Sequence, residues 1–92
     1  MKLGEAQAAF QAYEKAAELE PENSETQLKL ATFYMAAKNL KEARRRTDSV
    51  LVREPDNIEA LLLLGGILLN EQNIAEAESI FQKVIEIDSG DP

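Results

Sequence analysis

The chain has 92 residues, which suffices for one small domain but not for a catalytic module beside a regulatory one. It contains no histidine and no cysteine, so the usual zinc clusters, cysteine nucleophiles and imidazole bases are excluded. A net charge of −7 repels a phosphate backbone, so nucleic acid is not an expected partner. Binding remains the main class of function, and we expect no enzyme activity, cofactor or metal.

Apolar residues recur at spacings of three and four along the chain, which predicts helices, and no stretch alternates with the period of a strand. The first helix is expected over residues 4–19, because Pro21 prevents its continuation. The second helix starts around Ser24, which has the spacing of a capping box with Gln27, and ends near residue 37.

The second half of the chain continues this pattern. The third helix is expected over residues 40–53 and ends before Pro55. Asn57 is a good N-cap residue for a fourth helix that ends near residue 70, and a fifth helix covers residues 74–87. Connections of only a few residues favour antiparallel packing of successive helices. The predicted fold class is therefore all-α, with antiparallel helix pairs.

The sequence repeats with a period of 34 residues. The segment Glu20-Pro21-x-Asn23 recurs as Glu54-Pro55-x-Asn57, and the same offset aligns Leu28 with Leu62. The first twenty residues align with the second half of a unit. The chain therefore divides into the second helix of a truncated repeat (1–23), a full repeat (24–57) and a second repeat with a short C-terminal tail (58–92).

With this period, the chain resembles the tetratricopeptide repeat (TPR) family, whose unit is a helix pair with a large residue, Leu-Gly, Tyr, Ala, Phe and Pro at fixed spacing. The last repeat has Leu61, Leu64, Gly65, Leu68, Ala77 and Phe81 at these positions. The middle repeat has Gln27, Leu30, Ala31, Tyr34, Ala43, Thr47 and Pro55. The resemblance implies an α-solenoid of about five helices, two full repeats and a half repeat, as a fragment of a longer array.

The resemblance also implies that the first helix of each pair lines a concave face. The corresponding inward positions are Glu25, Leu28, Lys29, Thr32, Met35, Ala36, Glu59, Leu62, Leu63, Gly66, Leu69 and Asn70. Because other leucines already supply the core of the last helix pair, Leu62, Leu63 and Leu69 are expected to be surplus apolar surface.

Two interpretations of this apolar surface stay open. In the first, it is a groove for an amphipathic helix or an extended peptide, so the chain is a protein–protein interaction module that binds a protein or peptide partner. In the second, neighbouring repeats cover it, and the chain is a structural spacer or oligomerisation segment of a larger multi-repeat protein, with no ligand of its own.

Basic residues gather on the third predicted helix and its flanks. Residues 38–53 hold six of the ten basic side chains and carry a local charge of +4, against −11 for the rest of the chain. The candidate basic surface consists of Arg44, Arg45, Arg46 and Arg53. It either binds an acidic partner or is a solvated outer face that pairs with neighbouring acidic helices.

Membrane insertion is not expected, because the longest apolar run, residues 61–69, is less than half of what a membrane-spanning helix needs. The N-terminus lacks the pattern of a signal peptide, and the sequence does not indicate a compartment. Apolar side chains at both ends, including Phe10, Tyr13 and Ile85, predict self-association through the exposed repeat ends.

Overall fold

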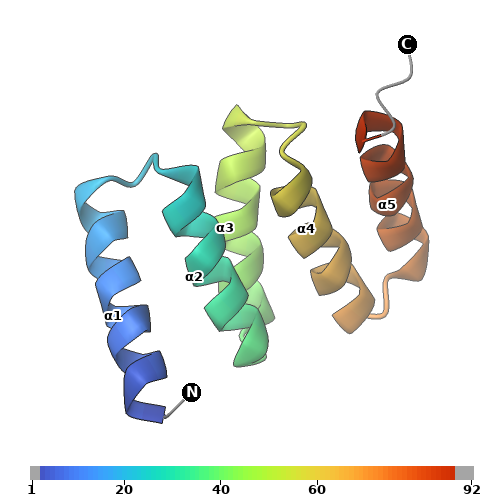
Figure 1. Ribbon diagram of the computed structural model, residues 1–92. Helices are drawn as coiled ribbons and strands as arrows, with labels where there is room; N and C mark the ends of the chain where they lie inside the picture. The colour runs from blue at the N-terminus through green and yellow to red at the C-terminus, as the bar shows by residue number, and fades with distance from the viewer. Residues whose placement is uncertain (1–2, 89–92) are drawn as a thin grey trace.

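The computed structural model describes residues 3–88 and folds them into five α-helices without a β-strand (Figure 1). The helices are α1 (Leu3–Leu19), α2 (Ser24–Ala36), α3 (Leu40–Arg53), α4 (Ile58–Asn70) and α5 (Ile74–Asp88). The all-α prediction is confirmed, and each predicted helix lies within about one residue of its observed bounds. The predicted tail after Asp88 lies outside the described residues.

Asparagine side chains begin three of the helices. Asn23 caps α2, where its Oδ1 accepts a hydrogen bond from the amide of Thr26 at 3.1 Å. Asn57 caps α4 in the same way, with its Oδ1 3.0 Å from the amide of Ala60, as predicted. The capping box predicted from Ser24 is wrong, because the cap position belongs to the preceding asparagine, which holds the extended conformation that an N-cap requires.

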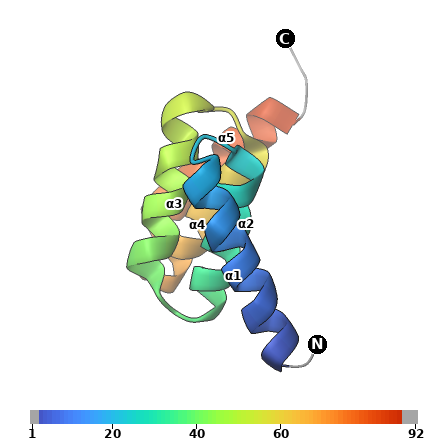
Figure 2. The ribbon, with the colours of Figure 1, turned by 90° about the vertical axis from the view of Figure 1, so that its left-hand side faces the viewer.

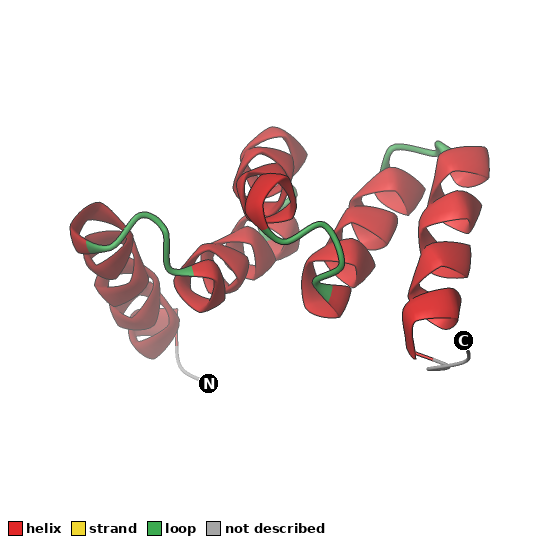
Figure 3. Cartoon of the chain, turned by 90° about the horizontal axis from the view of Figure 1, so that it is seen from above, coloured by secondary structure: helices red, strands yellow, loops and turns green. Residues whose placement is uncertain are grey.

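The helices form an elongated stack with principal extents of 43 × 27 × 22 Å. Helix α2 packs against α3 and α4 packs against α5, while α1 packs on α2 and α3 packs on α4. In addition α2 touches α4, and Figure 3 shows these two helices on one side of the stack with α3 on the other. Figure 2, viewed from the α1 end, shows α1 at the near end of the stack. The predicted stack of helix pairs is therefore confirmed.

Two buried clusters hold neighbouring helices together. The first consists of Leu28, Val50 and Ala60, with Leu51 and Leu63 packed against it. The second consists of Leu64, Leu68 and Ala77, with Leu51, Ile80 and Phe81 packed against it. Because Leu51 on α3 contacts both clusters, the core is continuous between the two helix pairs. None of the helices within residues 3–88 has the length and hydropathy that crossing a membrane requires.

Small residues allow the helices of a pair to approach closely, as expected. Gly65 on α4 lies directly under the ring of Phe81 on α5, since a Cβ added at Gly65 would come within 2.6 Å of that ring. In the other pair the matching positions hold Ala31 and Thr47, and both are completely buried. Glycine is thus required where the partner helix supplies the larger side chain.

Candidate protein interaction surface

A groove between α1 and α2 contains predicted inward positions, and we call it the α1–α2 groove. It has a volume of about 400 Å³ and is lined by Ala9, Tyr13, Lys29, Thr32, Phe33 and Ala36. The rings of Tyr13 and Phe33 lie 5.9 Å apart between centroids and form an aromatic wall. Lys29 is exposed and is the cationic side chain of this lining.

Three predicted inward residues of α2 line this groove, namely Lys29, Thr32 and Ala36, and they meet residues that the sequence analysis missed. The hydroxyl of Thr32 donates to the carbonyl of Leu28 at 2.9 Å, so its hydrogen is already bonded within α2. Phe33 was missed because it lies one position away from the inward face. Its repeat counterpart Ile67 is completely buried. The sequence signal that could have identified Phe33 is an aromatic residue at a core position next to the inward face.

A second part of the predicted face lies where α2 crosses α4. Met35 is half-buried against Gly66, where an added Cβ would come within 2.7 Å of the methionine Cε. Asn70 donates from its amide to the carbonyl of Gly66 at 2.9 Å and accepts from the Nζ of Lys38 at 3.1 Å. The contact of Met35 with Gly66 joins α2 to α4, and the bond from Lys38 joins the turn after α2 to Asn70, so Met35 acts in packing one helix pair on the other.

Leu28 is not a surface residue, which corrects its assignment as a partner contact. It is 2% exposed in the cluster with Val50 and Ala60, because α4 covers it. Leu63 packs against the same cluster and is half-buried, so it is not surplus apolar surface either. Both leucines are used in packing one helix pair on the next.

The remaining predicted contacts are exposed but do not gather in the α1–α2 groove. Leu62 and Leu69 are 47% and 45% exposed, and Glu25 and Glu59 lie near the N-termini of α2 and α4. Leu62 is the repeat counterpart of Leu28, so it lies on the side of α4 that faces away from α2. The predicted contacts are thus divided between the groove, the α2–α4 crossing and the end of the stack.

The candidate basic surface is largely engaged in contacts within the protein. Arg44 lies 3.6 Å from Asp48 and 3.4 Å from Glu71, the residue that follows α4. Arg45 donates to Glu42 at 2.9 Å, and this hydrogen bond holds the pKa of the Glu42 carboxyl below its ordinary value. Such ion pairs are expected of a solvent-exposed face whose basic side chains contact neighbouring acidic side chains.

The side chains of Arg46 and Arg53 have different surroundings. The guanidinium of Arg46 lies 5.9 Å from the ring centroid of Tyr34 and donates to the Oε1 of Gln27 at 3.0 Å. Its Nε is buried and makes no hydrogen bond to any described residue. Arg53 is exposed at the end of α3. The four arginines therefore differ in their partners and in their exposure.

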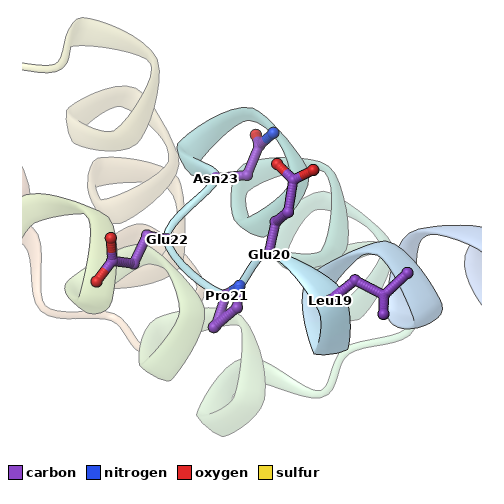
Figure 4. A pocket seen from close by; sticks show the side chains of 5 residues that line it. All are labelled: Leu19, Glu20, Pro21, Glu22 and Asn23. Carbon is purple, nitrogen blue, oxygen red and sulfur yellow. The ribbon is translucent and has the colours of Figure 1, made fainter.

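Two other hollows border α1. An apolar one of about 320 Å³ lies beside Phe10, whose ring meets those of Phe33 and Tyr34 edge to face at 5.7 and 5.4 Å. A shallow one of about 470 Å³ follows the loop after α1. In Figure 4 the side chains of Leu19, Glu20 and Glu22 at this loop point in different directions, so they do not converge on a ligand. Among residues 3–88, no cluster of acidic side chains has the makeup of a metal site.

The family model of the cytochrome c-type biogenesis protein H TPR domain matches residues 1–92. The formate-dependent nitrite reductase complex subunit NrfG of Escherichia coli O157:H7 is 33% identical over an alignment of 81 residues that covers 85% of this chain and 41% of NrfG. The human protein O-mannosyl-transferase TMTC1 is 29% identical over 89 residues, which are 97% of this chain and 10% of TMTC1. The chain spans less than half the length of either relative.

Among solved structures, the crystal structure of MamA has the same arrangement of helices. It superimposes with a TM-score of 0.78 at 25% sequence identity, over 97% of this chain and 56% of the MamA chain. The stack of helix pairs is therefore shared with a protein whose fold was determined by crystallography.

Proposed function

Because this chain belongs to the family of the cytochrome c-type biogenesis protein H TPR domain, we propose that it is a non-catalytic module that binds a peptide or protein segment on its concave face. TPR domains in general mediate protein–protein interactions. The relative NrfG is named as a subunit of a complex, and this supports a partner within a larger assembly. The single observation that carries the proposal is the apolar α1–α2 groove with Lys29 and Thr32 in its lining.

The lining determines what kind of segment fits. Tyr13, Phe33 and the alanines offer apolar contact, which favours an aliphatic or aromatic side chain of the partner. Lys29 is exposed at the groove and favours a carboxylate close to that side chain. The hydroxyl of Thr32 already donates within α2, so it has no hydrogen to donate to a partner. We infer that the partner segment combines a large apolar residue with a nearby acidic one.

Peptide selection tests this proposal. A phage-displayed library of random dodecapeptides is selected against the immobilised chain, and the enriched peptides are synthesised and titrated by calorimetry. Thr32→Trp replaces an exposed side chain of the lining with a bulky one that fills the groove. Lys29→Glu reverses the charge of the basic side chain in the lining. We expect each change to weaken binding of the selected peptides about tenfold or more. Lys41→Glu, an equal charge change at an exposed position of α3, is the matched control.

The variants must retain the circular dichroism spectrum of the parent chain for the titrations to count. Selected peptides that bind Thr32→Trp and Lys29→Glu as tightly as the parent chain would contradict the proposal. A selection that enriches no sequence would contradict it as well.

The second candidate, a structural spacer or oligomerisation segment, is favoured by one specific observation. Leu28 is 2% exposed, whereas its repeat counterpart Leu62 is 47% exposed. The same repeat position is thus buried between the helix pairs in the repeat of α2 and α3 and exposed to solvent in the repeat of α4 and α5. This difference concerns the end of the stack and not the concave face, so both roles are compatible in one module.

A further inference from the structure

Three aliphatic side chains of the last helix pair lie at the α5 end of the stack, and we call them the end face: Leu62, Val84 and Ile85. Ile85 is 60% exposed, Leu62 is 47% exposed and Val84 is half-buried. Their counterparts one repeat earlier are Leu28, Val50 and Leu51. Leu28 and Val50 are at most 2% exposed, and Leu51 packs against them. The end face therefore has the composition of an interface between helix pairs. Within residues 3–88, no further helix packs on it in the way that α4 packs on the earlier face.

The internal interface shows what a cover looks like. Helix α4 closes the earlier face with Ala60, which is completely buried, and with Leu63 three residues later, which packs against the same cluster. The small residue lets the helix axes approach, and the aliphatic residue fills the space beside it. A cover for the end face therefore needs a helix with a small residue followed after three positions by an aliphatic one.

The charges at the two faces are opposite. At the internal interface, Arg44 of α3 lies 3.4 Å from Glu71, which follows α4 and comes eleven residues after Ala60. The counterpart of Arg44 on α5 is Glu78, which is exposed. A cover with a glutamate at the Glu71 position would bring two carboxylates together, whereas a lysine or arginine would restore the ion pair.

We propose that the end face docks an α-helical hairpin of a partner whose first helix carries a small residue, an aliphatic residue three positions later and a basic residue eleven positions after the small one. This surface is separate from the concave face and does not depend on the proposed function. The basic residue would lie at the C-terminus of the first helix, where the helix dipole also favours a positive charge.

A second copy of this chain does not meet these requirements. Its α4 is followed by Glu71, which would face Glu78 of the first copy, and this helix is already packed between α3 and α5. Its α2 is covered by α1 and holds Lys29 where the aliphatic residue is needed. The charge and composition of the end face therefore favour a different polypeptide segment.

A tandem protein tests the inference. Residues 58–88 are repeated after residue 91, and Glu71→Arg is introduced into the added copy only. We expect the helical circular dichroism signal and the melting temperature to rise above those of the parent chain. The same tandem with glutamate retained should melt about 1 to 4 °C lower, the range expected of one partly exposed ion pair. Glu78→Arg in the original copy should reverse the order of the two tandems.

Ile85→Lys separates docking from general destabilisation. In the parent chain the side chain is 60% exposed, so we expect the melting temperature to change by less than about 2 °C. In the tandem, the same change should remove most of the gain. Equal stability of tandem and parent, or an unchanged order after Glu78→Arg, would overturn the inference. A dimer of the parent chain in sedimentation velocity that Ile85→Lys dissociates would also overturn it, because a second copy would then be the cover.

Discussion

The two helix pairs of this protein have the same geometry but hold it with different chemistry. In the pair α2–α3 the core position facing the loop is Gln27, whose Nε2 donates to the carbonyl of Pro21 at 2.9 Å, and the facing position on α3 is Thr47, which donates to Ala43 at 2.8 Å. In the pair α4–α5 the same positions hold Leu61 and Phe81. One pair thus satisfies buried polar groups, and the other fills the space with apolar side chains.

This comparison shows that neighbours, and not residue type, decide what a repeat position does. Leu28 and Leu62 are identical residues on equivalent helices, yet one is 2% exposed and the other 47%. The difference comes from α4, which covers the first leucine. A contact list for one repeat therefore cannot be transferred to the next without asking which helix lies beside it.

The strongest test of the comparison is to truncate the two equivalent leucines. We expect Leu28→Ala to lower the free energy of unfolding by about 2 to 5 kcal/mol, because it leaves a cavity between α2, α3 and α4. Leu62→Ala should cost less than about 1.5 kcal/mol, since nearly half of that side chain is already in solvent. Urea unfolding followed by circular dichroism measures both. Equal losses of unfolding free energy would contradict the different burial of the two leucines.

A second test exchanges the chemistry of the two pairs. Gly65→Ala places a Cβ within 2.6 Å of the Phe81 ring, and we expect a net loss of about 1 to 2 kcal/mol after the gain in helix propensity is subtracted. In a Phe81→Thr background the same change should cost nothing or stabilise, because Ala31 faces Thr47 in the other pair. The interaction energy of this double-mutant cycle is the quantity to measure. Additive effects would exclude the close contact.

A third test compares two helix starts. Asn57 accepts from the Ala60 amide at 3.0 Å with extended backbone angles, whereas Asn39 accepts from the Glu42 amide at 3.4 Å with φ −88° and ψ 73°. We expect Asn57→Ala to cost about 1 kcal/mol and Asn39→Ala about half of that, since the second bond is longer. Thermal unfolding monitored at 222 nm measures both variants. A larger loss at Asn39 would reverse this ranking.

Most of the fold could be predicted from the sequence, because the period and the helix breaks are local signals. Pro21, Pro55 and the Asn57 cap mark helix ends whatever the tertiary contacts are, whereas the cap of the second helix was assigned to Ser24 instead of Asn23. The candidate surface could be predicted only in part. Leu28 was assigned to the surface by analogy of position, although the structure buries it under the next helix. Phe33 was missed because its role in the groove depends on where α1 lies.

The smallest expected effect concerns a hydrogen bond that only the first helix pair has. The hydroxyl of Ser24 donates to the carboxylate of Glu54, and their repeat counterparts are Ile58 and Asp88, which lack that donor. This hydrogen bond, together with one from Asn57, lowers the pKa of Glu54 below its ordinary value of 4.5. The pKa of Glu42 is lowered as well, chiefly by its hydrogen bond with Arg45.

Because these folded-state pKa values are depressed, the unfolded chain binds more protons as the pH falls below about 4.5. The contribution to stability is therefore fully present above that value and is lost as the pH falls through the lower folded-state values. We expect the urea midpoint to fall between pH 6 and pH 3, and to fall less in Ser24→Ala than in the parent chain. Ser79→Ala, at an exposed serine of α5, is the matched control and should follow the parent chain. An acid-induced loss of the same size in Ser24→Ala and the parent chain would show that this hydrogen bond does not distinguish the two helix pairs.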